Sequence, residues 1–217
     1  MIKSIVEVGT MSAALKEETQ ARLEGAALPN PLIGPHTIQE WIELPSPEDG
    51  SSVELIFGHF HVDPPPSGEH QLAVTRLIRP FEDSISAAGR TDLYAVIGVG
   101  VKISSTLRNG SIPDVVIMDR PPAGASFPAE ALRLAVEVWS PGNDRNEREA
   151  KVVAYAAAGV PFLWTISRKG DHPGLELIAH RLHEGQYVLE NTVRAAGAAT
   201  ITAAPVPITL DSADLVF

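Results

Sequence analysis

The 217-residue chain contains no cysteine, few aromatic residues and fewer basic than acidic side chains. The absence of cysteine excludes disulfides, thiolate zinc sites and a cysteine nucleophile. Lysine and arginine total 17 against 27 aspartate and glutamate residues, which gives a formal net charge of −10. This charge argues against a broad basic surface that holds nucleic acid without regard to sequence, although it is compatible with a local basic groove.

Long apolar runs are also absent. No stretch approaches the length of a membrane span, and the first fifteen residues lack the apolar core and cleavage site of a secretory signal. We therefore expect a soluble protein of the cytoplasm. Hydrophobic residues nevertheless make up 44% of the chain and charged residues 20%, a composition that is typical of a globular domain with a sizeable core and excludes disorder of the whole chain.

The spacing of apolar residues predicts a mixed order of strands and helices. Residues 1–35 are expected to form an N-terminal helical extension, with its helix over 3–24, and a proline-rich linker, followed by one domain over 36–217. Apolar residues at helical spacing predict helices at 38–44, 69–87 and 145–158. Apolar runs between turn residues predict strands at 53–57, 59–62, 93–104 (as one or two strands), 113–118, 133–139, 160–167, 175–182, 186–190 and 207–210, with a loop at 121–128.

This order indicates an α/β fold, with a mixed α+β sheet flanked by helices. The strand at 133–139, the helix at 145–158 and the strand at 160–167 form a strand-helix-strand unit. Such units pair their strands in parallel with a right-handed crossover, so we expect that arrangement here.

Acidic residues inside apolar strands are the most informative feature of the sequence. Glu137 lies between two valines, Asp114 precedes the run VVIM, and Glu54 lies inside VELIF. Burying a carboxylate costs several kcal/mol unless it is paired or bound to a metal. Any one of these residues alone is more often a solvated group at a strand end, but Glu137 is the hardest to explain in that way because Trp139 on its own face is also apolar.

Asp114 and Glu137 are expected to converge if the strands at 113–118 and 133–139 pair. By strand alternation, Glu137 faces the opposite side of the sheet from its valine neighbours. Two carboxylates that meet at one end of a sheet repel each other, and a divalent cation relieves that repulsion. Oxygen ligands suit Mg²⁺ or Mn²⁺, so the pair forms a candidate metal site.

Lys151 lies on the helix that follows the Glu137 strand, 14 residues downstream. A short turn could return this lysine over the same end of the sheet, where it would orient a water or stabilise charge on a phosphate. Alternatively, Glu147 and Lys151 stand at i and i+4 and would form an ordinary surface pair worth a few tenths of a kcal/mol. Spacing alone slightly favours the surface pair.

Two histidines, His59 and His61, alternate on one face of the second hairpin strand. This spacing can ligate a metal ion, but no third ligand is evident in the nearby sequence. Exposed strand histidines are therefore the favoured interpretation.

Four segments together resemble a known family. PDVVIMDR, followed by LAVEVWSPGNDRNEREAKVVAYAAAGVPFLWTIS, is similar to the Uma2 family, once called DUF820, of restriction endonuclease-like proteins. TIQEWIELP and VELIFGHFHVDPPPSGEHQLAVTRL resemble that family's helix, its glutamate-containing hairpin and its proline loop, and ITLDSADLVF fits its end. The resemblance covers roughly residues 36–217, and four motifs in the right order are fairly specific.

The resemblance implies a restriction endonuclease-like core of the PD-(D/E)xK nuclease superfamily, with a metal site at one end of the sheet. Asp114 matches the aspartate of the PD motif and Glu137 the second acidic ligand, so these two would hold Mg²⁺ or Mn²⁺. Glu54 matches the hairpin glutamate, and Lys151 matches the family's displaced lysine. His70 would lie near the acidic cluster as a supporting or proton-shuttling residue, or else in solvent at a helix start, with the two alternatives about even.

The expected function is therefore that of a metal-dependent endonuclease that hydrolyses phosphodiester bonds of nucleic acid, DNA first. A homodimer is also expected, because nucleases of this class often cut two strands symmetrically. The sequence departs from the wider nuclease pattern at Trp139, which stands two residues after Glu137 where a lysine is usual, and at Phe57, where an aspartate is more common. A catalytically inactive fold that acts as a binding or assembly module is the alternative function.

Overall fold

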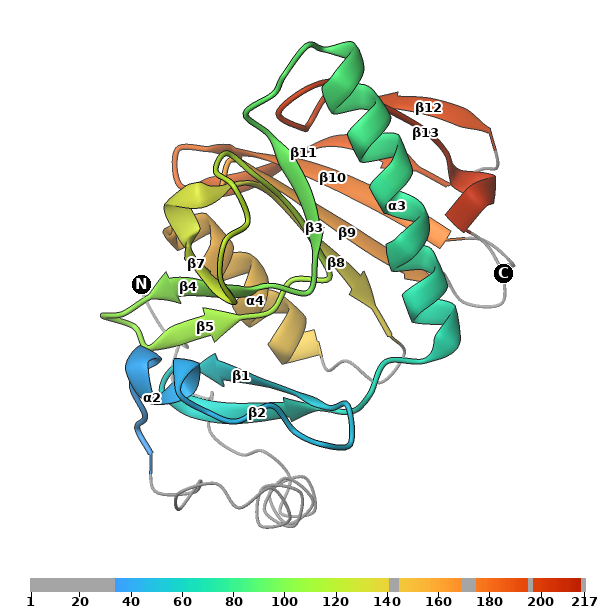
Figure 1. The fold of residues 1–217 in the computed structure, drawn as a ribbon. Helices are drawn as coiled ribbons and strands as arrows, with labels where there is room; N and C mark the ends of the chain where they lie inside the picture. Colours follow the sequence, from blue (N-terminus) through green and yellow to red (C-terminus); the bar gives the residue numbers. More distant parts are fainter. Residues whose placement is uncertain (1–33, 141–144, 169–174, 195–196, 216–217) are drawn as a thin grey trace, which may run out of the picture.

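The computed structural model describes residues 34–140, 145–168, 175–194 and 197–215, in a mixed α/β arrangement of three sheets and flanking helices (Figure 1). The central sheet has the strand order β11 (Gln186–Val193), β10 (Leu175–His183), β9 (Phe162–Arg168), β8 (Leu132–Trp139), β6 (Val115–Met118) and β3 (Tyr94–Ile97). The second sheet has the order β2 (His59–Asp63), β1 (Ser52–Ile56), β5 (Asn109–Ser111), β4 (Gly100–Ser104) and β7 (Ser126–Pro128). The remaining elements are the strand pair β12 (Ala198–Ile201) and β13 (Ile208–Asp211), the helices α2 (Ile38–Ile42), α3 (Gly68–Ala87) and α4 (Arg145–Ala157), and the 3₁₀ turns η1 (Ala129–Ala131) and η2 (Ser212–Leu215).

The expected α/β class is confirmed, and the pairings that matter most are present. β1 and β2 form the expected hairpin, β6 pairs antiparallel with β8, and β8 pairs in parallel with β9 across α4. The segment 93–104 forms two strands that belong to different sheets, with Gly98 between them at φ 59°. Glycine adopts this left-handed conformation without strain. Gly98 therefore allows the turn by which the chain passes from one sheet to the other.

Short strands account for most of the remaining differences. β5 and β12 were not expected, and β7 lies in the segment 121–128 that was expected to be a loop. The longer β11 extends to Val193, past its expected end at residue 190. Elements of three or four residues carry too few apolar positions to show a period. The expected helix over 3–24 lies outside the described residues. Within the part of the chain that is described, no helix has the length and apolar content needed to span a membrane.

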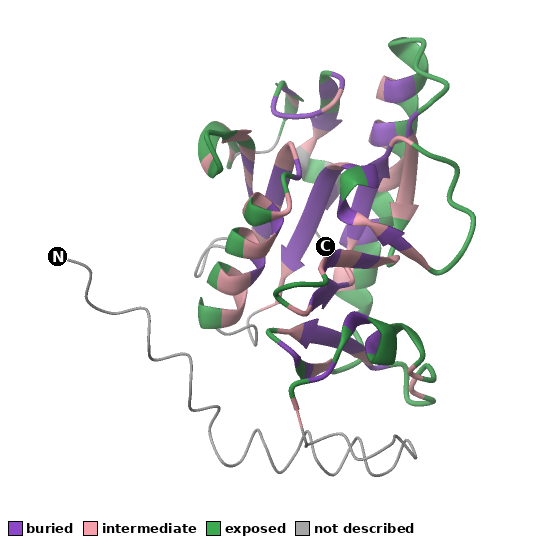
Figure 2. Ribbon diagram, turned by 90° about the vertical axis from the view of Figure 1, so that its left-hand side faces the viewer, coloured by how far each residue is buried: buried purple, intermediate pink, exposed green. Residues whose placement is uncertain are grey.

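The long helix α3 packs against one face of the central sheet (Figure 1). Its side chains Val74, Leu77 and Phe81 are buried in one cluster with residues of β6, β8 and β9, and Phe81 meets the ring of Trp164 edge to face. Helix α4 and residues of the second sheet form a separate apolar cluster with the opposite face. The central strands are therefore buried on both sides, as the continuous apolar content of β8 indicates (Figure 2).

The alternation of β8 decides what faces each layer. Leu134, Val136 and Val138 belong to the cluster under α3, whereas Ala135 belongs to the cluster on the α4 side. Glu137 shares the face of Ala135, and only 3% of this residue is exposed. The strand thus places a carboxylate in the layer between the central sheet and α4.

Helix α2 packs against the second sheet, which carries Glu54 on β1. Thr37 caps α2 through a capping box with Glu40, and the indole Nε1 of Trp41 donates a 2.6 Å hydrogen bond to the Val53 carbonyl of β1. The Trp41 ring lies directly on Gly110 of β5: a Cβ atom there would be only 2.5 Å from the ring. Residue 110 must therefore lack a side chain for α2 to dock.

We expect Gly110→Ala to lower the free energy of unfolding by about 1–3 kcal/mol, because the added methyl group forces the Trp41 ring and β5 apart. Urea unfolding followed by circular dichroism measures this difference. Gly68→Ala is the matched control, since a Cβ atom at this first residue of α3 meets no heavy atom within 4 Å. Equal stability of the two variants would contradict this prediction and show that the Trp41 ring can move away from residue 110 at no cost.

Candidate active site

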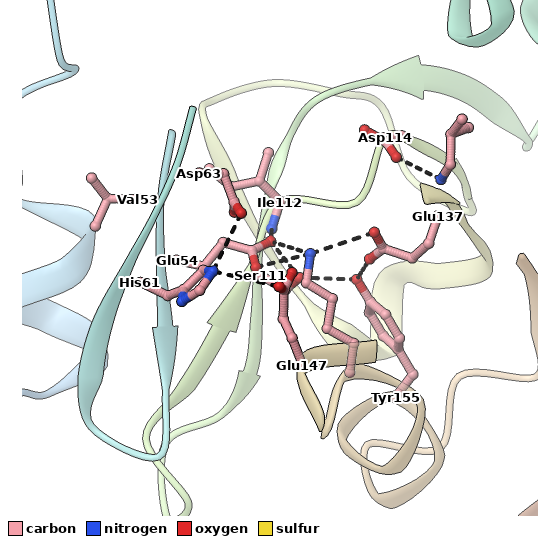
Figure 3. A network of polar contacts seen from close by, with 12 residues as sticks. Val53, Glu54, His61, Asp63, Ser111, Ile112, Asp114, Glu137, Glu147 and Tyr155 are labelled. Atoms are coloured by element: carbon pink, nitrogen blue, oxygen red, sulfur yellow. Dashed lines mark hydrogen bonds and ion pairs between the residues drawn. The ribbon is translucent and has the colours of Figure 1, made fainter. Parts of the chain in front are cut away.

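Three charged side chains from three elements meet in the layer beside β8 (Figure 3). The Nζ atom of Lys151, on α4, lies 2.9 Å from Oε2 of Glu54, on β1, and 3.4 Å from Oε2 of Glu137. The exposed fractions are 1% for Glu54, 3% for Glu137 and 8% for Lys151. The interpretation of Lys151 as half of a surface pair is therefore wrong, because α4 returns this lysine to the sheet end where Glu137 lies.

Neutral polar groups complete the network around the two glutamates. The Tyr155 hydroxyl donates a 2.6 Å hydrogen bond to Oε1 of Glu137 and lies 3.0 Å from the Ser111 hydroxyl. Oε1 of Glu54 accepts hydrogen bonds from the Ser111 hydroxyl at 2.8 Å and from the backbone N–H of Ile112 at 2.7 Å. Both carboxylates are thus held in fixed orientations.

Burial controls the protonation of this network. It raises the pKa of Glu137 to about 8; the Asp114 and Glu54 carboxylates act in the same direction, while Lys151 and the Tyr155 hydroxyl oppose it. Burial lowers the pKa of Lys151, but attraction to Glu137 and Glu54 outweighs it and raises that pKa well above its usual value. Burial and the neighbouring carboxylates therefore favour the protonated form of Glu137, whereas the two glutamates favour the charged form of Lys151.

Asp114 lies next to Glu137 across the strand pair, one residue beyond the pairing of Val115 with Val136. One oxygen of its carboxylate accepts a 2.7 Å hydrogen bond from the backbone N–H of Val138, and the other lies 2.8 Å from Nε2 of His70. The expected pairing of the two strands is therefore present, and it places Asp114 across from Glu137.

His70, in the first turn of α3, is directed at Asp114 and not at solvent. Its side chain is 12% exposed, and the bond to Asp114 raises its pKa against the opposing effect of burial. Of the two alternatives for His70, the structure has the one near the acidic residues. Its Nδ1 atom is buried and has no hydrogen-bond partner.

A second cluster lies beside Glu54 and contains His61, Asp63 and Glu147 (Figure 3). His61 Nε2 lies 3.4 Å from Oδ1 of Asp63 and 3.6 Å from Oε2 of Glu147. Contact with Asp63 raises the pKa of His61 against the effect of burial, and burial raises the pKa of Glu147. The expectation of exposed strand histidines is correct for His59 and wrong for His61, whose partners include a residue more than eighty positions away.

Trp139 stands two residues after Glu137, at the position where the family resemblance leads us to expect a lysine. Its half-buried ring has two cations from α4 beside it: Lys151 Nζ at 5.9 Å and Arg148 Cζ at 5.6 Å from the ring centroid. Arg148 also donates a 2.7 Å hydrogen bond to the Ser140 carbonyl. The positive charge missing from the strand is thus supplied by the helix.

The space behind the network is small. A cavity of about 20 Å³ is lined by Glu54, Ser111, Lys151, Tyr155 and neighbouring apolar residues. This volume holds about one water molecule. It is too small for a nucleotide.

Sequence reasoning identified Glu54, Asp114, Glu137, Lys151 and His70, and the structure places these five residues in two connected groups. It brings Glu54, Glu137 and Lys151 into direct contact, with Asp114 and His70 paired beside them. Ser111 and Tyr155 were missed. Tyr155 stands one helical turn after Lys151 and could have been found from that spacing, whereas Ser111 lies on a three-residue strand that gives no signal.

The comparisons with known proteins agree with the overall fold. The family model described as "Uma2: Putative restriction endonuclease" matches residues 38–211. A solved structure from Anabaena variabilis ATCC 29413, described as a "putative nuclease belonging to DUF820", has a TM-score of 0.60 and 17% identity. The alignment covers 83% of this chain and 97% of that one, and at this identity it supports the fold. The comparison with curated proteins found no match.

We expect Lys151→Met to lower the free energy of unfolding by about 3–5 kcal/mol, because it leaves the Glu54 and Glu137 carboxylates buried without a cation. Urea unfolding measures this loss. Lys102→Met, on β4, makes the same change at another lysine and is the control. Adding Glu54→Gln to Lys151→Met should restore part of the stability, and a double variant no more stable than Lys151→Met alone would contradict a charge-based cause.

Proposed function

The chain belongs to the Uma2 family of restriction endonuclease-like proteins, and we propose that it is a metal-dependent endonuclease that hydrolyses phosphodiester bonds of nucleic acid, with DNA as the favoured substrate. The observation that carries this proposal is the position of Lys151. Its ammonium group lies 3.4 Å from Glu137 although the strand position normally used is Trp139. Acidic and basic groups of the kind that phosphodiester hydrolysis needs are therefore present at one sheet end.

The carboxylates at this end fit a hard divalent cation. We propose that Asp114 and Glu137 hold Mg²⁺ or Mn²⁺, with Glu54 as a further acidic group. The donor set consists of oxygens, and Oε2 of Glu54 is buried without a hydrogen bond, with the Lys151 ammonium as its ionic contact. Such a cation supplies Lewis acidity and an activated water when it is bound.

The chain's own residues then have separate tasks. Lys151 stabilises negative charge that develops on the phosphate or orients the attacking water. Tyr155 fixes the Glu137 side chain through its 2.6 Å hydrogen bond. His70 holds the Asp114 carboxylate in one orientation through its 2.8 Å contact. Residues that hydrogen-bond to metal ligands commonly have this task.

An inactive binding or assembly module is the alternative outcome, and Mg²⁺ or Mn²⁺ binding that depends on Glu137 separates the two. A calorimetric titration in which the wild type binds neither ion, or binds both no better than Glu137→Gln does, would favour the module. The homodimer and the cytoplasmic location stay predictions from the sequence.

We expect Glu137→Gln to reduce metal-dependent cleavage by about 100-fold or more. Losing a residue that only hydrogen-bonds to a metal ligand already costs about 10–100-fold, and Glu137 is proposed to bind the metal directly. The assay uses supercoiled plasmid and single- and double-stranded oligonucleotides, with Mg²⁺, Mn²⁺ or a chelator. Glu149→Gln is the matched control, since Glu149 lies exposed on α4 in an ion pair with Arg145. Full activity of Glu137→Gln would refute the proposed site, and an inactive wild type on every substrate would favour the module.

We expect His70→Ala to raise the Mn²⁺ concentration needed for half-maximal cleavage by about 10–100-fold, because Asp114 loses the partner that orients it. The measurement is a metal titration of the cleavage rate beside a thermal unfolding curve. His59→Ala, which removes an exposed histidine, is the control. A changed melting temperature with an unchanged metal dependence would assign His70 a purely structural role.

A further inference from the structure

The cluster of His61, Asp63 and Glu147 joins the hairpin to the helix that carries Lys151. His61 and Asp63 stand two residues apart on β2, so their side chains share one face of the strand. Glu147 comes from the first turn of α4. Among the residues that the structure describes, these three form the one group of this kind whose ligand atoms all lie within 4.8 Å of one another.

The distances in the cluster suit ligands of one ion better than hydrogen bonds. His61 Nε2 is 3.4 Å from Asp63 and 3.6 Å from Glu147, longer than the usual range of about 2.7–3.2 Å for such a bond. Ligand atoms about 2.0–2.2 Å from one tetrahedral cation lie roughly 3.3–3.6 Å apart. The two distances from His61 therefore match those between ligands of one ion, and the third pair of ligand atoms lies within 4.8 Å.

Glu54 adds a further buried carboxylate beside this cluster. It lies directly opposite His61 in the β1–β2 pairing, so the two side chains project from the same face of the hairpin. Glu54 is 1% exposed, and Lys151 Nζ lies 3.0 Å from its Oε1 atom and 2.9 Å from its Oε2 atom. Among the described residues Oε2 accepts no hydrogen bond, so it retains an unused acceptor position next to the cluster.

Three carboxylates surround His61. Asp63 lies 3.4 Å and Glu147 3.6 Å from its Nε2 atom, and Glu54 stands opposite it in the hairpin. Such a position attracts positive charge. A dication between His61, Asp63 and Glu147 would supply that charge and leave the imidazole neutral, as a metal ligand must be.

We propose that His61, Asp63 and Glu147 form a second cation site, separate from Asp114 and Glu137, which binds a first-row transition-metal dication, with Zn²⁺ as the favoured ion. The imidazole ligand distinguishes this site from the all-oxygen one, because imidazole suits Zn²⁺ and carboxylates alone suit Mg²⁺. The ion would fasten β2 to α4 one helical turn before Lys151. The proposal goes beyond the nuclease function, since the ion would bind whether or not the chain hydrolyses nucleic acid.

Calorimetric titration of the full chain, stripped with a chelator, tests the second site. Zn²⁺ and Mg²⁺ are titrated separately into Glu137→Gln, which weakens the first site. We expect one equivalent of Zn²⁺ to bind, with Zn²⁺ favoured over Mg²⁺. Adding His61→Ala should weaken Zn²⁺ binding by about 100-fold or more. A direct ligand contributes at least as much to metal affinity as a residue that only hydrogen-bonds to a ligand.

Two matched controls separate loss of a ligand from general damage. His59→Ala removes an exposed histidine from the same strand, and Glu149→Gln is paired with the test variant Glu147→Gln on the same helix. Both controls should retain Zn²⁺ affinity, and Zn²⁺ should raise the melting temperature of each control and not of the His61→Ala variant. Unchanged Zn²⁺ affinity in folded His61→Ala, or Zn²⁺ binding that disappears in Glu137→Gln alone, would overturn the proposal.

Discussion

The contact on which the site depends is the burial of one ammonium group between two carboxylates. Lys151 lies against Glu54 and Glu137, and all three residues are less than a tenth exposed. Removing any one partner from such an arrangement leaves a desolvated charge, which is why the fold must hold all three in place. Glu54 belongs to the second sheet and Glu137 to the central one. The lysine therefore joins two sheets as well as two charges.

The hydrogen bonds around this contact make its geometry specific. Ser111 and the backbone of Ile112 bind one oxygen of Glu54, while Tyr155 binds one oxygen of Glu137. Lys151 contacts the other oxygen of each glutamate and also donates a 3.0 Å hydrogen bond to Oε1 of Glu54. A polar network with these fixed partners can present carboxylates to a cation without large side-chain rearrangement, which is the property expected of a prepared metal site.

The sequence predicted the longer elements and the charged residues of the site for a physical reason. Long strands and helices carry enough apolar positions to show their period, and a carboxylate such as Glu137 inside a valine run has few structural explanations. The partners of these residues could not be predicted in the same way. His61 meets Glu147 only because α4 folds back over β2, and Ser111 reaches Glu54 from a strand of three residues. Such contacts depend on how the sheets and helices pack, and they cannot be predicted from the local sequence.

The composition of α4 links the site to local unfolding. The buried residues of this helix are Lys151 and Tyr155, and both end in polar atoms that bond to the buried carboxylates. The helix is therefore held to the body of the protein by the same groups that form the site, together with apolar contacts such as those of Val152 and Ala154. Detachment of α4 and disassembly of the charge network should be one cooperative opening event, with a free energy below that of global unfolding. A ligand that binds the assembled network would then slow amide hydrogen exchange throughout α4, including turns that it never touches.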